Sequence, residues 1–136
     1  MHRDIGDALR WFVANRAGWR CEYCLIYEED SYFTHQIDHI ISRKHGGRSV
    51  SSNLAYTCVR CNTLKGTDIG SVNLKTGALI AFFNPRREHW RSHFMLNGPV
   101  IEPMTAEGAA TARVFQFNLD TRVAERRVLM AFGRFP

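Results

Sequence analysis

The spacing of apolar residues along the chain predicts helices at both ends and strands between them. Apolar residues recur at helical spacing in residues 3–17, which predict a helix with Asp4 as its cap and Gly18 at its end. Residues 105–117 and a segment that begins at Asp120 show the same periodicity, and each predicts a helix with one apolar face. Because strands are expected between these helices, the sequence favours the α+β class.

Residues 36–41 predict a strand with a polar centre. The segment is rich in isoleucine and is apolar on either side of Asp38 and His39. Neighbouring residues point to opposite faces of a regular strand, so these two can serve one site only if the backbone bends or a bulge turns one of them. A basic loop with glycines follows over residues 43–49, and residues 57–64 are expected to run from a turn into a helix.

The second half of the chain predicts two β-hairpins separated by a short helix. Residues 71–83 contain a turn at residues 75–77, and residues 94–102 contain the stronger signal of an Asn-Gly turn at residues 97–98. Between the hairpins, a short helix with Pro85 at its first position is expected.

The length and composition fit one globular domain with an excess of basic residues. The chain has 136 residues, of which 45% are hydrophobic and 23% are charged, and its formal net charge is +5. We expect a single domain over residues 1–136, with a motif core at 18–68 and an accessory part at 69–136. The accessory part holds nine basic and five acidic residues, so most of the positive excess lies there. This charge suits a nucleic-acid partner. No apolar run approaches the roughly 20 residues of a membrane helix, and no membrane partner is expected.

The four cysteines predict a structural zinc site. They form two Cys-x-x-Cys pairs, Cys21/Cys24 and Cys58/Cys61, a spacing that lets two thiolates from one turn reach the same tetrahedral ion. Residues 25–57 separate the pairs, which is longer than the usual spacing of a two-pair zinc motif. We therefore expect this segment to fold into the working part of the site.

Two other uses of paired cysteines fit this chain less well. Disulfides form in oxidising compartments, and the N-terminal sequence shows no basic segment followed by an apolar one, as a secretion signal would. A redox motif would need only one pair beside a βαβ pattern, which is not evident. We therefore expect reduced cysteines and a cytoplasmic protein.

A longer motif over residues 21–66 contains these cysteines. Between and after the cysteine pairs it includes Asp38-His39-Ile40-Ile41, Gly46-Gly47, Asn53-Leu54, Asn62 and Lys65-Gly66. This motif resembles the HNH endonucleases, the ββα-metal nucleases, in their four-cysteine zinc subgroup. Asn62 stands where the family's name has its second histidine, so the chain is an HNN variant. The family implies a ββα-metal core pinned by a four-cysteine zinc site, here with extra hairpins and C-terminal helices, and metal-dependent hydrolysis of phosphodiester bonds in DNA.

The resemblance also implies a role for each residue of the motif core. His39 is the expected general base, Asn53 ties the loop in place, and Asp38 and Asn62 bind one divalent ion. A neutral histidine with a pKa near 6.5 can take the proton of an attacking water at working pH. Because a carboxylate and an amide oxygen are hard ligands, we expect catalytic Mg²⁺ or Mn²⁺ in addition to the structural Zn²⁺.

Basic residues beside the motif are candidate contacts to a nucleic-acid backbone. They are Lys65, Arg60, Arg43, Lys44 and Arg48. A candidate second patch in the accessory part consists of Arg86, Arg87 and Arg91.

Two alternatives to a DNA endonuclease stay open at the level of the sequence. The chain could be a zinc-stabilised nucleic-acid-binding module without catalysis. Its substrate could also be RNA, because nothing in the motif reads base edges or a 2′-hydroxyl. The sequence predicts no oligomeric state.

Overall fold

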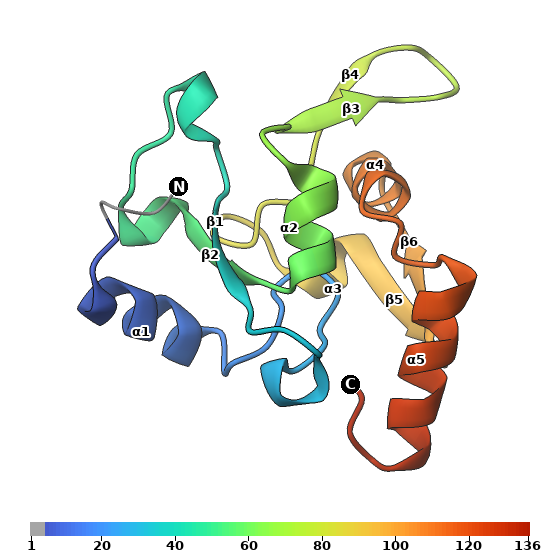
Figure 1. The fold of residues 1–136 in the computed structure, drawn as a ribbon. Helices are drawn as coiled ribbons and strands as arrows, with labels where there is room; N and C mark the ends of the chain where they lie inside the picture. The colour runs from blue at the N-terminus through green and yellow to red at the C-terminus, as the bar shows by residue number, and fades with distance from the viewer. Residues whose placement is uncertain (1–4) are drawn as a thin grey trace. The chain divides into compact units, whose positions relative to one another are not determined.

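The computed structural model describes residues 5–136, which form a mixture of helices and strands (Figure 1). The predicted α+β class is confirmed. The expected cap Asp4 lies outside the described residues. By its internal contacts, the chain expected as one domain divides into two compact units, Met1–Asp68 and Ile69–Pro136. Within the described part, no helix is both long enough and apolar enough to span a membrane.

The first unit contains a two-stranded sheet between helices. Its described elements are α1 (Asp7–Arg16), the 3-10 helices η1 (Glu28–Asp30), η2 (Arg43–His45) and η3 (Ser51–Asn53), the strands β1 (Gln36–His39) and β2 (Leu54–Thr57), and α2 (Val59–Lys65). The two strands pair antiparallel, with Gln36 opposite Thr57 and His39 opposite Leu54. α2 follows β2 almost directly and packs against β1. The unit therefore has a ββα order in its second half.

α1 covers the hairpin and closes the core of this unit. The buried core consists of Ile5, Val13, Ala14, Ile37, Leu54 and Tyr56. Gly6 has extended backbone and serves as the N-cap of α1. The helix ends as predicted at Gly18, whose φ of 65° is a left-handed conformation that suits glycine. The helix thus presents its apolar face to the strands that carry the motif.

The second unit contains both predicted hairpins. Its elements are β3 (Gly70–Val72), β4 (Leu79–Ala81), α3 (Trp90–His93), β5 (Phe94–Asn97), β6 (Val100–Pro103), α4 (Ala106–Val114) and α5 (Asp120–Ala131). β3 pairs with β4 and β5 pairs with β6, both antiparallel. Gly98 in the second turn has a φ of 56°, as the Asn-Gly signal requires. Both hairpin predictions are confirmed.

An aromatic core holds the second unit together. α4 packs against β3, β4 and β6. The buried aromatic side chains are Phe82, Phe83, Phe94, Phe115 and Phe117. Several of these rings meet edge to face, for example Phe94 and Phe117 at 5.5 Å between centroids. This unit therefore has a hydrophobic core of its own.

Two predicted helices of the second unit have different bounds. The prediction of a helix that begins at Pro85 is wrong. This segment forms a single turn, and α3 begins only at Trp90. The Asn84 side chain accepts a hydrogen bond from the Arg86 backbone N–H at 2.9 Å, and this local bond closes the turn without a helix. α4 ends at Val114 and not at residue 117, because the backbone reverses at Gln116, where φ is 52°.

Two arginines of α5 point into the second unit. Arg122 and Arg126 are 3% and 2% exposed. Arg122 Nη1 donates to the Phe115 carbonyl at 2.6 Å, and Arg126 Nη2 donates to the Phe117 carbonyl at 2.7 Å. Both guanidinium groups therefore satisfy backbone carbonyls just after α4. The surface of this unit carries less positive charge than the residue count suggests.

Candidate functional site

The four cysteines lie together in the interior of the first unit. Cys21 and Cys24 belong to the turn between α1 and β1, and Cys58 and Cys61 belong to the start of α2. Their Sγ atoms all lie within 4.8 Å of one another, and all four residues are buried. Cys24 Sγ and Cys58 Sγ, one from each pair, are 3.6 Å apart. The two pairs therefore face a common centre.

This arrangement fits a structural metal such as zinc. Four thiolates about 2.3 Å from a tetrahedral zinc ion stand about 3.8 Å from one another, which agrees with the observed cluster. Backbone amides support the sulfur atoms, since Cys24 N donates to Cys21 Sγ and Cys61 N donates to Cys58 Sγ, each at 3.4 Å. Burial raises the pKa of the Cys21 and Cys61 thiols, so a metal ion that binds them must displace their protons.

The cysteine cluster is connected to the strands of the motif. Cys58 is the N-cap of α2, and its Sγ accepts the amide of Cys61. One cysteine pair precedes β1 and the other follows β2. A metal ion in the cluster would therefore hold the start of α2 against the turn that leads to β1.

His39 is the last residue of β1 and faces the loop that follows. Its side chain is largely buried, and its Nε2 lies 2.8 Å from Ser49 Oγ, within hydrogen-bond distance. The ladder between β1 and β2 runs through Asp38 and His39 without a bulge. The two side chains therefore leave opposite faces of the strand, as a regular strand requires. The bend that would direct both to one site is not observed.

Asn53 ties the loop of residues 40–52 at three points. Its Oδ1 accepts the Ile41 N–H, and its Nδ2 donates to the carbonyls of Ile41 and Arg48, each at 2.9 Å. The chain passes so closely here that a Cβ on Gly47 would lie 1.6 Å from the Ile41 carbonyl oxygen and 2.8 Å from Asn53 Nδ2. Only glycine fits this crossing. The loop that carries Ser49 therefore has a defined path back to the end of β1.

Asp38 leaves the other face of β1 and is buried under α2. Lys65 Nζ lies 3.2 Å from Asp38 Oδ1, and the Tyr23 hydroxyl donates to Asp38 Oδ2 at 3.3 Å. Burial raises the pKa of the Asp38 carboxyl to about 6, although the Lys65 ammonium and both hydrogen bonds oppose this rise. Lys65 Nζ also donates to the His39 carbonyl at 2.9 Å. One ammonium thus joins α2 to two consecutive residues of β1.

Asn62 lies one helical turn before Lys65 and faces Gln36 on β1. Its Nδ2 donates to Gln36 Oε1. Gln36 and Asp38 are two residues apart and share one face of the strand. The helix is therefore aligned along β1, with Asn62 beside Gln36 and Lys65 beside Asp38.

Comparison with known protein families agrees with this geometry. Residues 21–68 match the HNH endonuclease family. These residues form an HNH domain. The match ends at Asp68, which is also the last residue of the first unit. The predicted resemblance is confirmed for this segment, and the family is one of nucleases. No curated protein and no solved structure matches the chain.

The HNH domain offers oxygen ligands for a divalent ion, but the carboxylate among them already has other partners. A carboxylate and an amide oxygen are ligands of the type that Mg²⁺ and Mn²⁺ prefer. Both carboxylate oxygens of Asp38, however, already accept hydrogen bonds from Lys65 and Tyr23. The Asn62 amide nitrogen donates to Gln36, so this bond does not occupy the Asn62 oxygen. An ion at Asp38 would have to compete with the Lys65 ammonium, so this arrangement fits an ion far less well than the cysteine cluster does.

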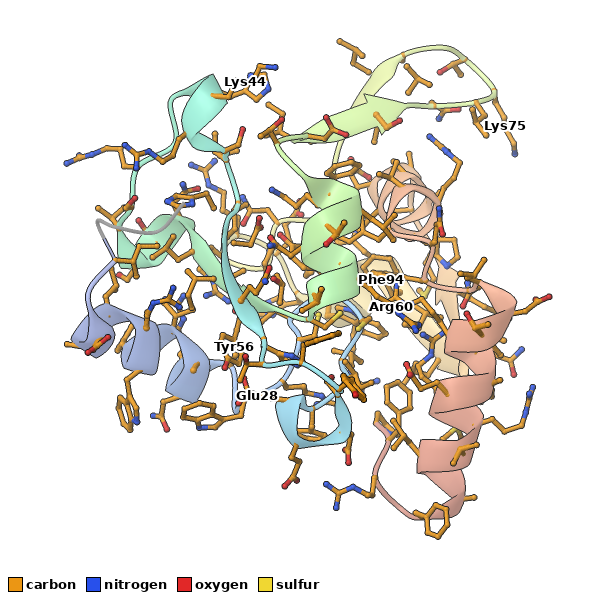
Figure 2. All side chains as sticks on the ribbon, viewed as in Figure 1. Glu28, Lys44, Tyr56, Arg60, Lys75 and Phe94 are labelled. Carbon is orange, nitrogen blue, oxygen red and sulfur yellow. The ribbon has the colours of Figure 1, made fainter. Side chains whose placement is uncertain are left out.

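Most of the predicted nucleic-acid contacts lie on the surface of the HNH domain. Arg43, Lys44 and Arg48 are exposed on the loop before Asn53, and Arg60 is exposed near the start of α2. Figure 2 shows Lys44 on the outside of η2. Lys65 differs from this group, because it is 2% exposed and its ammonium binds inside the domain. In the second unit, Arg87 and Arg91 are exposed and Arg86 is half-buried.

Three residues of the site were not among those predicted from the sequence. Ser49 contacts His39, Tyr23 contacts Asp38, and Gln36 contacts Asn62. A serine in a polar loop has no periodicity that marks it. For Gln36, the spacing of two residues before Asp38 placed it on the same face of the predicted strand, and this was the one available clue.

Proposed function

We propose that the protein is a metal-dependent DNA endonuclease that hydrolyses phosphodiester bonds, with His39 as the general base. One observation carries this proposal: in a segment that matches the HNH endonucleases, His39 stands at the end of β1 with its ring held by the tied loop. A histidine in a packed, oriented setting is what proton abstraction from a positioned water needs.

The reaction follows from the chemistry of neutral imidazole. His39 accepts a proton from a water molecule while the water oxygen attacks the phosphorus of the scissile phosphate. The new P–O bond forms as the bond to the 3′ oxygen breaks, and that oxygen leaves with a proton taken from solvent or from a neighbouring group. The base works only while its imidazole is neutral, so activity should be lost in acid, where an imidazole is protonated.

A divalent ion is part of this proposal. When bound, Mg²⁺ or Mn²⁺ would supply positive charge at a phosphate oxygen. Asp38 and Asn62 offer the hard oxygen donors that such an ion prefers, but Asp38 could bind it only by giving up its bonds to Lys65 and Tyr23. Zn²⁺ in the cluster of Cys21, Cys24, Cys58 and Cys61 would serve the fold and take no part in the reaction.

The basic loop supports a nucleic acid as the substrate. Arg43, Lys44 and Arg48 are exposed between β1 and Asn53, on the loop that also carries Ser49. Side chains of this kind bind phosphate oxygens and place the backbone without reading the sequence. We propose DNA as the substrate, and RNA is the competing substrate that the assay must include.

A cleavage assay with defined metals tests the proposal. Zinc-loaded protein is incubated with supercoiled plasmid, or with a matched single-stranded RNA, in Mg²⁺, in Mn²⁺ and without added divalent ion, and the zinc content is measured before and after. Nicking or linearisation of the plasmid only with Mg²⁺ or Mn²⁺ supports the proposal. Cleavage of the RNA alone would move the substrate to RNA. A zinc-loaded protein that retards DNA in a gel and cuts neither substrate would be a nucleic-acid-binding module.

A further inference from the structure

We propose that Ser49 is a positioning residue that fixes the tautomer of His39 by accepting a hydrogen bond from its Nε2–H. The inference rests on the proposed function, since it states how the general base is prepared for its reaction. The observation behind it is the distance of 2.8 Å between His39 Nε2 and Ser49 Oγ.

Neutral imidazole has one N–H group and one lone pair, on different ring nitrogens. Only the nitrogen with the lone pair can accept a proton from water. When Nε2 carries the hydrogen, Nδ1 has the lone pair and acts as the base. When Ser49 donates its hydroxyl hydrogen to Nε2, the lone pair of Nε2 is used and Nδ1 carries the hydrogen, so that neither nitrogen is available to water. A base at this position therefore requires Ser49 to accept.

The loop places Ser49 with little freedom. Asn53 Nδ2 binds the carbonyl of Arg48, the residue directly before Ser49, at 2.9 Å. The same amide binds the Ile41 carbonyl, two residues after His39, at 2.9 Å. Gly47 passes so close to Ile41 that a side chain cannot be accommodated there. The two ends of the contact are thus joined through one amide, and Asn53 acts on His39 through Ser49.

The backbone of His39 is held separately from its ring. Lys65 Nζ donates to the His39 carbonyl at 2.9 Å, and Ile40 N donates to the Asn53 carbonyl at 2.9 Å. These bonds place the Cα of His39 but leave rotation of the imidazole to other contacts. The bond to Ser49 provides a contact that selects both the ring orientation and the protonated nitrogen.

Ring-nitrogen NMR tests the tautomer without reference to cleavage. The zinc-loaded protein is labelled with ¹⁵N-histidine, and the signals of His39 are assigned by their loss in His39→Gln. At a pH at which the imidazole is neutral, we expect the wild type to show the Nε2–H tautomer and Ser49→Ala to show a mixture of both tautomers. An Nδ1–H tautomer in the wild type, or His39 shifts that do not change in Ser49→Ala, would overturn the inference.

Kinetics then connect the tautomer to the reaction. Ser49→Ala should lower kcat about 10- to 100-fold with KM nearly unchanged, because the base remains and only its orientation and protonation are released. Ser49→Thr keeps the hydroxyl and should restore most of the rate and the wild-type shifts. Ser52→Ala, an exposed serine of the same loop, is the matched control and should behave as wild type.

The outcomes separate this inference from the proposed function. If the wild type cuts no nucleic acid, the proposed function fails, while the ring-nitrogen shifts still decide whether Ser49 sets the tautomer. If the wild type cuts and Ser49→Ala cuts at the same rate with zinc retained, the positioning role is wrong and the nuclease remains. If Ser49→Ala does not fold, the tautomer of the wild type and the rate of Ser49→Thr decide.

Discussion

Lys65 and Asp38 form an ion pair of 3.2 Å between α2 and β1, and both side chains are almost completely buried. Burying two opposite charges costs desolvation energy that their attraction only partly offsets, so such a pair is weak evidence for stability and stronger evidence for a required geometry. Here the same ammonium also binds the His39 carbonyl. The pair therefore fixes α2 against the strand that carries the proposed base.

Replacement of Lys65 by methionine should destabilise the first unit. The variant leaves the Asp38 carboxylate without its cation and removes the bond to His39, and we expect a loss of about 3 to 5 kcal/mol in the free energy of unfolding at pH 7. Urea unfolding of zinc-loaded protein measures it. The double variant Lys65→Met/Asp38→Asn should recover part of this loss, since no buried charge remains. If the losses of unfolding free energy in Lys65→Met and in Asp38→Asn simply added up in the double variant, the two side chains would not be coupled and the prediction would be wrong.

The Asp38 carboxyl should make stability depend on pH in the acid range. Burial raises its pKa to about 6, so the native protein holds this proton more tightly than the unfolded chain does. The stabilisation that results is fully present below the pKa of the carboxyl in the unfolded state, near 4, and is lost as the pH rises through 6. It should amount to roughly 2 to 3 kcal/mol, since one pKa unit corresponds to about 1.4 kcal/mol.

The measurement compares wild type with Asp38→Asn, which stays neutral at every pH. Without added divalent ions, the free energy of unfolding of the wild type relative to the variant should fall between pH 4 and pH 7. Titration of the cysteine cluster affects both proteins and cancels in the difference. A difference that is flat or that rises with pH would show that the Lys65 cation outweighs the burial of Asp38.

Local sequence patterns predicted the parts of the fold that depend on near neighbours. The cysteine spacing predicted the cluster of four thiols, the Asn-Gly pair predicted the turn at Gly98, and Gly18 predicted the end of α1. The prediction of a helix at Pro85 was wrong, because the pattern does not show the hydrogen bond that the Asn84 side chain accepts. This bond closes a turn in place of the helix.

The packing between elements could not be predicted from these patterns. Lys65 was grouped with the other basic residues as a candidate contact to nucleic acid. Its position in the sequence shows which side of the helix it lies on, but not which element packs against that side. Arg122 and Arg126 belong to the basic excess of the accessory part, and their charge alone does not show that they bind carbonyls inside the second unit. Ser49 reaches His39 only through the path that Asn53 and Gly47 impose on the loop.

Removal of zinc should unfold the HNH domain selectively. The cysteine cluster joins the segment before β1 to the segment after β2. Without a metal ion, no bonds connect its four buried thiols, and this link between the two segments is lost. The second unit has its own aromatic core. Hydrogen exchange of the full chain, before and after treatment with a zinc chelator, should show lost protection in β1, β2 and α2 and retained protection in β5, β6 and α4. Unchanged protection throughout would contradict a structural role for the metal.

The basic loop should dominate electrostatic binding to DNA. Replacement of Arg43, Lys44 and Arg48 together by alanine should weaken binding and reduce the slope of log K against log salt by about 1 for each phosphate that the variant no longer binds. Fluorescence anisotropy with a labelled duplex at several salt concentrations measures both quantities. Lys75→Ala, in the exposed turn between β3 and β4 (Figure 2), is the control and should keep the wild-type slope. An equal effect of both changes would mean that the loop is not the binding surface.

The rate of DNA cleavage by His39→Ala, measured beside His45→Ala, tests the central claim most directly. His45 is an exposed histidine of η2 in the same loop, so it controls for the loss of an imidazole near the site. With equal zinc content and Mg²⁺ present, we predict that His39→Ala loses at least about 100-fold in rate while its affinity for DNA is kept, and that His45→Ala cuts like the wild type. Full cleavage by a zinc-loaded His39→Ala protein would contradict the assignment of His39 as the general base.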